Sequence, residues 1–192
     1  SPLNLLLTYP PNDDFSARLP LAGVKTKASG YLAGASSEPD EPRHGEGALG
    51  TTAWWSWRAP EDAEATFTLT PFGFQAALAV YAGDDLASLT LLGSSLTPPD
   101  NLTNPPAARV TRSISGGQNV AIAVDAVSGT PGDYLLDLTA VPAPPSLDAL
   151  RRGPAPDSRP LLDVGHLRGR KFAVDSSVNM RDWETKIGRA HV

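Results

Sequence analysis

Short alternating patterns of apolar and polar residues run along most of the chain, and turn-forming residues separate them. The alternation is clearest in TFTLT at residues 66–70 and in YLLDLTAV at residues 134–141. A period of two is typical of a strand with one buried face, because successive side chains point to opposite faces of a sheet. No helix-period segment longer than about two turns stands out before residue 141. The pattern therefore predicts strands rather than helices.

Gly, Pro, Asn or Asp falls in most gaps between these patterns, at the spacing expected of a β-sandwich. The predicted fold class is all-β: an antiparallel, jelly-roll-like β-sandwich of about eight strands, followed by a linker and a truncated β fragment. The eight strands are expected at residues 24–33, 52–59, 65–71, 76–81, 88–93, 107–114, 119–124 and 132–139.

The same pattern divides the chain into five segments. Residues 1–10 end a preceding segment, and residues 11–141 form the sandwich. Residues 142–160 are rich in proline and predict a semi-extended linker. Residues 161–186 again suggest strands, but too few to close a core. The last six residues, IGRAHV at 187–192, resemble the translation of a sequencing-adapter read, so we exclude them from functional reasoning.

Composition narrows the classes of partner and chemistry. The 192 residues are 41% hydrophobic, which allows a packed core, and the 19 prolines and 17 glycines favour turns. The net charge is −5 without a basic block in the sandwich, so nucleic acid is not an expected partner. No apolar run approaches the roughly 18 residues that a membrane span needs. Cysteine is absent, which excludes thiol nucleophiles, disulfides and Cys-ligated zinc.

Six motifs follow one another within the predicted sandwich. They are NDDF (12–15), EPDEPRH (38–44), WWSWRAP (54–60), FQAALAVYAGDDLASL (74–89), VAIAVDA (120–126) and GDYLLDL (132–138). In this order they resemble the bacterial extracellular β-sandwich modules related to pre-peptidase C-terminal (PPC-like) domains. The resemblance implies a secreted or cell-surface bacterial protein, with other domains of the same polypeptide as partners. It also implies that any catalytic activity belongs to the parent protein rather than to this module.

Two departures from that family pattern bear on metal binding. Gln75 stands where the family usually has Asp, and LGSSLTPPD at residues 92–100 replaces an Asn-Asp-rich turn, so carboxylate oxygens are missing at both places. Oxygen ligands are what calcium requires, and their loss weakens a calcium site at that edge.

A second resemblance lies near the C-terminus, in RKFAVDSSVNMRDWETK at residues 170–186. It is similar to the hairpin that ends short β modules of large, secreted, multi-domain bacterial proteins. Five residues fall on that pattern: Ser176, Ser177, Asn179, Met180 and Trp183. This resemblance also implies a modular, secreted neighbourhood.

Nucleophilic catalysis has little support in the sequence. No G-x-S-x-G elbow is present, and the only histidines are His44, His166 and His191. HGEG at residues 44–47 is superficially similar to an oxyanion loop, but no serine in an elbow accompanies it. We therefore expect that this chain is not an enzyme.

The EPDEPRH motif, hereafter the acidic loop (residues 38–44), is the candidate metal site. Glu38, Asp40 and Glu41 are weak calcium candidates, because hard cations prefer oxygen ligands. His44 has no second histidine nearby, which is poor for zinc. The alternative is a solvated acidic loop whose prolines fix its path. No other cofactor is expected.

The stretch AWWSWRAP, residues 53–60, places three tryptophans within four residues. In a strand, Trp55 and Trp57 share an apolar face with Ala53 and Ala59 and should pack between the sheets. Trp54 lies on the opposite face, where it is either partly exposed or covered by the acidic loop.

Two functions remain open at this point. The first is a non-catalytic structural or accessory module of a secreted multi-domain protein. The second is a carbohydrate- or surface-binding module, because rigid exposed aromatic faces pack against sugar rings. Its stacking rings would be Trp54, Tyr81 and Tyr134, and its polar rim Glu38, Glu41 and His44. The exposure of the rings distinguishes the two.

Overall fold

The computed structural model describes residues 9–45, 48, 50–98 and 107–143, and the backbone of four short strands beyond them. The chain divides into two compact units, Ser1–Pro142 and Ala143–Val192.

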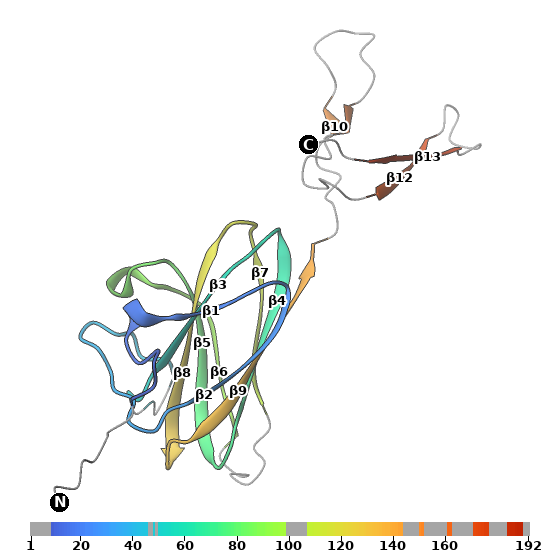
Figure 1. The fold of residues 1–192 in the computed structure, drawn as a ribbon. Helices are drawn as coiled ribbons and strands as arrows, with labels where there is room; N and C mark the ends of the chain where they lie inside the picture. The colour runs from blue at the N-terminus through green and yellow to red at the C-terminus, as the bar shows by residue number, and fades with distance from the viewer. Residues whose placement is uncertain are drawn as a thin grey trace, which may run out of the picture. The chain divides into compact units, whose positions relative to one another are not determined.

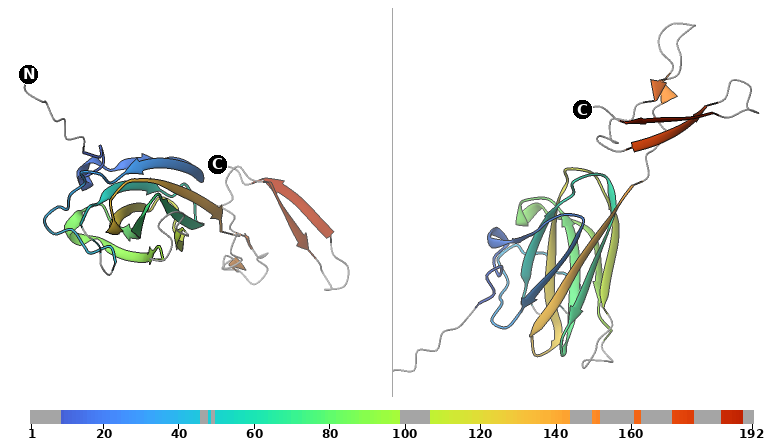
Figure 2. Two further views of the ribbon diagram at one scale, coloured as in Figure 1. Left: turned by 90° about the horizontal axis from the view of Figure 1, so that it is seen from below. Right: turned by 45° about the vertical axis from the view of Figure 1, so that its right-hand side comes forward.

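The first unit is a β-sandwich of two facing sheets (Figures 1 and 2). Sheet A has the strand order β1-β3-β8-β5-β6, and sheet B has the order β2-β9-β4-β7. The predicted fold class is thereby confirmed. The strands are β1 (Leu19–Leu21), β2 (Lys25–Tyr31), β3 (Ala53–Arg58), β4 (Ala63–Pro71), β5 (Phe74–Ala82), β6 (Thr90–Leu96), β7 (Ala108–Ile114), β8 (Asn119–Gly129) and β9 (Asp133–Pro142).

Several strands differ from the predicted ones: β8 ends at Gly129 instead of residue 124, and β6 and β9 also end later than expected. Strand β1 was not predicted, because three residues with a central proline carry no alternation; it pairs in parallel with β3, whereas the other neighbours are antiparallel. Strand β6 begins two residues later than expected, because Leu86–Ser88 form the short 3-10 helix η2. The Asp85 side chain caps η2 by accepting a hydrogen bond from the backbone N–H of Ala87. Among the described residues, no helix is long and apolar enough to cross a membrane.

The main core lies between the two sheets, and the paired tryptophans belong to it as predicted. Trp55 and Trp57 are 5% and 2% exposed and share this core with Ala53 and Ala59. The Trp57 ring meets the ring of Phe67 edge to face, with 6.0 Å between the centroids. Period-two alternation in β3 therefore carries both rings inward.

A buried hydrogen bond crosses this core from one sheet to the other. The Trp55 Nε1–H donates to the Tyr134 hydroxyl over 2.9 Å. Tyr134 is completely buried, and burial raises the pKa of its phenol to about 12, while the hydrogen bonds from Trp55 and then Asn12 lower it less. The hydroxyl thus stays protonated and satisfies the indole donor.

Replacing Tyr134 by phenylalanine should destabilise the sandwich by about 1–2 kcal/mol, because the buried indole N–H of Trp55 loses its acceptor. Urea denaturation followed by tryptophan fluorescence measures the change. Tyr31→Phe is the matched control, since its hydroxyl makes an exposed hydrogen bond. Equal stabilities of the two variants would contradict the assignment.

The described residues of the second unit form two antiparallel pairs of strands. Strand β10 (Leu150–Arg151) pairs with β11 (Leu161–Leu162), and β12 (Lys171–Ser176) forms a hairpin with β13 (Glu184–Arg189). Strand β13 continues past residue 186, where the β fragment was expected to end, into the adapter-like segment. Of the hairpin pattern, Ser176 ends β12, and Ser177, Asn179, Met180 and Trp183 lie outside the described residues.

Candidate functional site

A second hydrophobic cluster covers the outer face of sheet A, on the side away from sheet B. Trp54 is its largest member and is 0% exposed. We call it the outer cluster; its buried residues are Phe15, Trp54, Ala79, Tyr81, Ala121 and Ala123. Sheets of a sandwich commonly leave their outer faces to solvent. Here two segments cover this face instead: η1 (Phe15–Ala17) and the chain between β2 and β3.

Aromatic rings pack around Trp54 from both covering segments. The Phe15 ring lies edge-on to Trp54, with 4.9 Å between the centroids, and the His44 ring lies nearly perpendicular to it at 5.0 Å. Tyr81, from β5, is 6.2 Å from Trp54. The possibility that Trp54 is partly exposed is therefore wrong, and the acidic loop covers it through His44.

The other two proposed stacking rings are buried as well. Tyr81 is 2% exposed within the outer cluster, and Tyr134 is 0% exposed in the main core on sheet B. The structure therefore brings Trp54 and Tyr81 together but keeps Tyr134 apart from them. A sugar ring needs an open aromatic face, so the prediction of a stacking platform made from these three rings is wrong on exposure.

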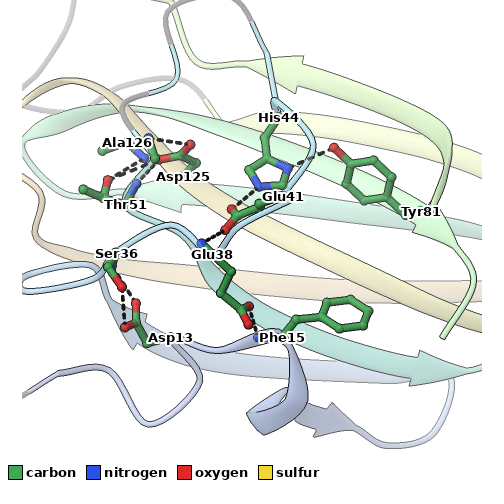
Figure 3. A network of polar contacts seen from close by, with 11 residues as sticks. Asp13, Phe15, Ser36, Glu38, Glu41, His44, Thr51, Tyr81, Asp125 and Ala126 are labelled. Carbon is green, nitrogen blue, oxygen red and sulfur yellow. Dashed lines mark hydrogen bonds and ion pairs between the residues drawn. The ribbon is translucent and has the colours of Figure 1, made fainter. Parts of the chain in front are cut away.

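The acidic loop contributes a buried row of polar groups (Figure 3). The His44 Nδ1 shares a hydrogen bond of 2.9 Å with the Tyr81 hydroxyl, and its Nε2 lies 2.7 Å from Glu41 Oε1. The other Glu41 oxygen accepts from the backbone N–H of Glu38 over 2.8 Å. His44 and Glu41 side chains are 1% and 5% exposed. Every polar atom of the His44 ring and the Glu41 carboxylate thus has a protein partner.

The preceding turn, NDDF, ties the acidic loop to β3. Asn12 exchanges two hydrogen bonds of 2.8 Å with the backbone of Trp54. The Asp13 carboxylate accepts from the backbone N–H and the hydroxyl of Ser36, and Glu38 accepts from the N–H of Phe15 (Figure 3). Glu38, which the sequence suggested as part of a polar rim for a ligand, therefore connects the two covering segments to each other.

Asp125 is a member of this site that the sequence analysis missed. It is 1% exposed on β8. Its Oδ1 accepts from the backbone N–H and the hydroxyl of Thr51 at 2.8 and 3.1 Å, and its Oδ2 from the N–H of Gly50 at 3.2 Å. A carboxylate in an otherwise apolar strand, VAIAVDA, was the available signal, because buried charges require partners.

The pKa values of Glu41 and Tyr81 are shifted in opposite directions, because hydrogen bonding outweighs burial at Glu41 and burial dominates at Tyr81. Burial tends to raise the pKa of Glu41, but hydrogen bonds from His44, Thr52 and the backbone of Glu38 outweigh it and leave the pKa below 4.5. Burial raises the pKa of Tyr81 to about 12, with further contributions from the charges of Glu41 and Asp125. Glu41 is therefore ionised and Tyr81 protonated at neutral pH.

The free energy of unfolding should fall at acidic pH, because Glu41 becomes protonated there. Its folded-state pKa is lowered, so ionised Glu41 stabilises the fold above its ordinary value of 4.5, and this contribution is lost as the pH falls through the folded-state pKa. Glu41→Gln should cost about 1–2 kcal/mol at pH 7, and the difference from wild type should shrink towards pH 3. Urea midpoints at several pH values measure this. Glu64→Gln, at an exposed position of β4, is the control; a pH-independent difference for Glu41→Gln would contradict the assignment.

A cavity of about 280 Å³ lies beside the acidic loop, lined in part by Glu38, Glu41, Arg43, His44 and Asp125. Three of these side chains are carboxylates, and each already accepts hydrogen bonds from the protein. This arrangement stabilises the loop and places no free buried base or nucleophile toward the cavity among these residues.

The three calcium candidates do not converge on one point. Glu38 and Glu41 bond to backbone groups as described, and Asp40 is exposed, with a positive φ of 67°. Within the described part of the chain, no three His, Asp or Glu residues are grouped so that they could hold a metal ion. The acidic loop thus forms a hydrogen-bonded cover over the outer cluster, and calcium binding by these residues stays a prediction.

Comparison with known proteins gives structural likeness only. No family model matches the chain, and no curated protein matches it. The pre-peptidase C-terminal domain of collagenase from Bacillus anthracis is similar over 64% of this chain and 94% of that chain, with 11% identity and a TM-score of 0.41. A family 35 carbohydrate-binding module from an environmental isolate is similar over 56% of this chain and 88% of that chain, with 17% identity and a TM-score of 0.35. A CBM35 from Cellvibrio japonicus Abf62 is similar over 59% of this chain and 88% of that chain, with 13% identity and a TM-score of 0.32.

Proposed function

We propose that the sandwich is a non-catalytic accessory module of a secreted, multi-domain bacterial protein. The observation that carries this proposal is the use made of the acidic loop. Its buried groups, Glu41 and His44, bind Tyr81 and the loop's own backbone, and so fix the cover of the outer cluster. The order of sequence motifs, which resembles that of PPC-like modules, supports the secreted, modular setting.

An enzymatic role for this loop would need groups that reach a substrate. His44 is 2% exposed, and both of its ring nitrogens are engaged. A general base must be within hydrogen-bond reach of the proton it removes. A substrate could reach His44 only after the loop had left Trp54, which would expose the outer cluster to water. Covering and stabilising the sheet is therefore the better function for these residues.

The alternative is a carbohydrate- or surface-binding module built on Trp54 and the acidic loop. It was motivated by exposed aromatic rings, and these rings are buried. Trp54, Tyr81 and Tyr134 offer no open ring faces. The rim residues Glu38 and Glu41 already accept hydrogen bonds from backbone groups. A sugar would have to break these bonds before it could form its own.

The proposal is tested with the full chain against libraries of peptides and glycans. We expect no turnover of any substrate. His44→Gln is the matched variant, because it removes the imidazole while keeping a polar side chain. Turnover by the repurified wild type would overturn the accessory role, and its loss in His44→Gln would place that activity at the acidic loop.

A further inference from the structure

The edge strands of the sandwich differ in how far another strand could pair with them. The edges are β1 and β6 in sheet A, and β2 and β7 in sheet B. An edge strand offers unpaired N–H and C=O groups to an incoming strand unless something blocks it. Strand β1 is only three residues long and has Pro20 at its centre, so it offers little for pairing.

Side chains connect β6 and β7 along the side of the sandwich that these two strands share. The backbone N–H of Arg109 donates to the Ser95 hydroxyl over 3.2 Å, and the Arg112 guanidinium donates to the Leu92 carbonyl. These contacts between the sheets occupy edge groups of both strands. Within the described part of the chain, β2 is therefore the long edge strand that no such contact blocks.

The pairing of β2 with β9 shows which backbone groups of β2 face the open side. The N–H of Leu32 donates to the Gly132 carbonyl over 3.0 Å, in register with the strand pair. Hydrogen-bonded pairs alternate along an antiparallel ladder, so the even-numbered residues of β2 hydrogen-bond to β9. The N–H and C=O groups of Lys25, Lys27 and Ser29 point the other way. All three residues are exposed, and no described residue hydrogen-bonds to these outward groups.

The outer face of this edge carries positive charge. Lys27 forms an exposed ion pair with Asp137 over 3.1 Å. Lys25 lies opposite Thr139, and no described residue forms an ion pair with it. Opposite charges on directly paired residues stabilise a sheet, so the charge of Lys25 favours an acidic side chain on an added strand.

The inner face of the same edge carries small side chains next to the main core. Thr26, Ala28 and Gly30 are half-buried, and Ala28 packs against that core. Their neighbours across β9 on this face are large, and Tyr134 and Leu136 are completely buried. Apolar side chains on an added strand would extend the core here, because apolar surface gains free energy when it leaves water. An added strand is thus favoured when acidic and apolar residues alternate in it.

We propose that β2 binds an extended peptide segment of a partner, in which acidic and apolar residues alternate, as a fifth strand of sheet B. The outward N–H and C=O groups of Lys25, Lys27 and Ser29 pair with the backbone of the segment, and its alternate side chains provide specificity. The same lysines disfavour pairing with a second copy of this chain, whose edge has the same charge. This surface is separate from the acidic loop, and the proposal goes beyond the accessory role.

The test is the fluorescence anisotropy of a labelled peptide of about nine residues, the length of an ordinary strand, in which glutamate and valine alternate. The peptide is titrated with the full chain. We expect saturable binding at least about ten-fold tighter than that of a peptide of equal composition without alternation, and than that of a lysine–valine peptide. Absence of saturable binding up to about 1 mM, or equal affinities for the three peptides, would overturn the proposal.

Variants of the full chain connect this binding to the edge of β2. Proline at position 29 removes only an N–H that faces the open side, which edge strands tolerate, so Ser29→Pro should stay folded and bind at least about ten-fold more weakly. Ser29→Ala is the matched control and should stay within about two-fold of wild type. Lys25→Glu should weaken binding of the glutamate–valine peptide about five-fold and strengthen binding of the lysine–valine peptide. Equal affinities of wild type and folded Ser29→Pro, with folding verified by circular dichroism, would contradict binding at this edge.

Amide hydrogen exchange followed by nuclear magnetic resonance tests the same edge in the wild type, without relying on a variant. The glutamate–valine peptide should slow exchange of the Lys25, Lys27 and Ser29 amides at least about ten-fold, because they become hydrogen-bonded. The amides of Thr26 and Ala28 already hydrogen-bond to β9 and should change less. Bound peptide without protection of the three outward amides would overturn the assignment to β2.

Discussion

Replacing Trp54 by alanine is expected to destabilise the sandwich by about 3–5 kcal/mol, the range for removal of a fully buried large aromatic side chain. Trp54 is 0% exposed, and it is the common neighbour of Phe15, His44 and Tyr81 in the outer cluster. Its loss leaves a cavity beneath the acidic loop. Since domains are stable by only about 5–15 kcal/mol, the variant should be partly unfolded at modest urea concentrations. Urea denaturation followed by circular dichroism measures the effect.

Trp54→Phe is the control for this prediction. Among the described residues, the Trp54 indole N–H has no hydrogen-bond partner although it is buried. Phenylalanine removes this unsatisfied donor while it keeps much of the apolar contact, so we expect a loss of no more than about 1–2 kcal/mol. An exposed, ligand-facing tryptophan would behave differently: both substitutions would leave stability within about 0.5 kcal/mol of wild type.

Replacing Gly30 by alanine should cost about 3 kcal/mol, through a steric conflict in the main core. A methyl group on Gly30 would lie 2.3 Å from the Tyr134 hydroxyl oxygen and 2.4 Å from its ring carbon Cζ. Tyr134 is fully buried, and Trp55 donates a hydrogen bond to it, so the ring has little room to move. Overpacking of this kind outweighs the gain of up to about 1 kcal/mol from removing a glycine inside a strand. Thermal and urea unfolding both measure the change.

Gly132→Ala is the matched control, because the nearest atom to its added methyl group would be the Phe72 carbonyl oxygen at 3.6 Å, an ordinary contact. It should change stability by less than about 1 kcal/mol. A second comparison uses Gly30→Ala in a Tyr134→Phe background, where removal of the hydroxyl should recover part of the loss. Additive effects of the two substitutions would contradict a direct conflict between these residues.

Several strands could be predicted from local patterns because one face of each is buried against the other sheet. In β4, buried positions alternate with half-buried or exposed ones, as TFTLT suggested. Strand β5 is buried over most of its length on both faces, and it was still predicted, because a continuous apolar run bounded by turn residues also indicates a strand. Strand β1 could not be predicted, because its existence depends on parallel pairing with β3 rather than on its own three residues.

The candidate site also combines features that the sequence predicts locally with contacts that only the tertiary structure shows. The sequence singled out Glu38, Glu41 and His44 as a group, since they lie within seven consecutive residues. It could not show that their partners would be one another, the Phe15 backbone and a tyrosine 37 residues away. Asp125 likewise meets Thr51 across 74 residues. Polar residues in a loop suggest a ligand site until the tertiary structure shows how many of their hydrogen bonds the protein itself satisfies.

By itself, the sequence determined the sandwich class and the inward direction of Trp55 and Trp57, because alternation along a strand fixes which side chains share a face. Only the tertiary structure decided the environment of Trp54. Alternation assigns that ring to the outer face of sheet A, but exposure there depends on which other segments fold over it. The turn at Phe15 and the loop at His44 provide that cover, and such contacts between distant segments leave no periodic signal in the sequence.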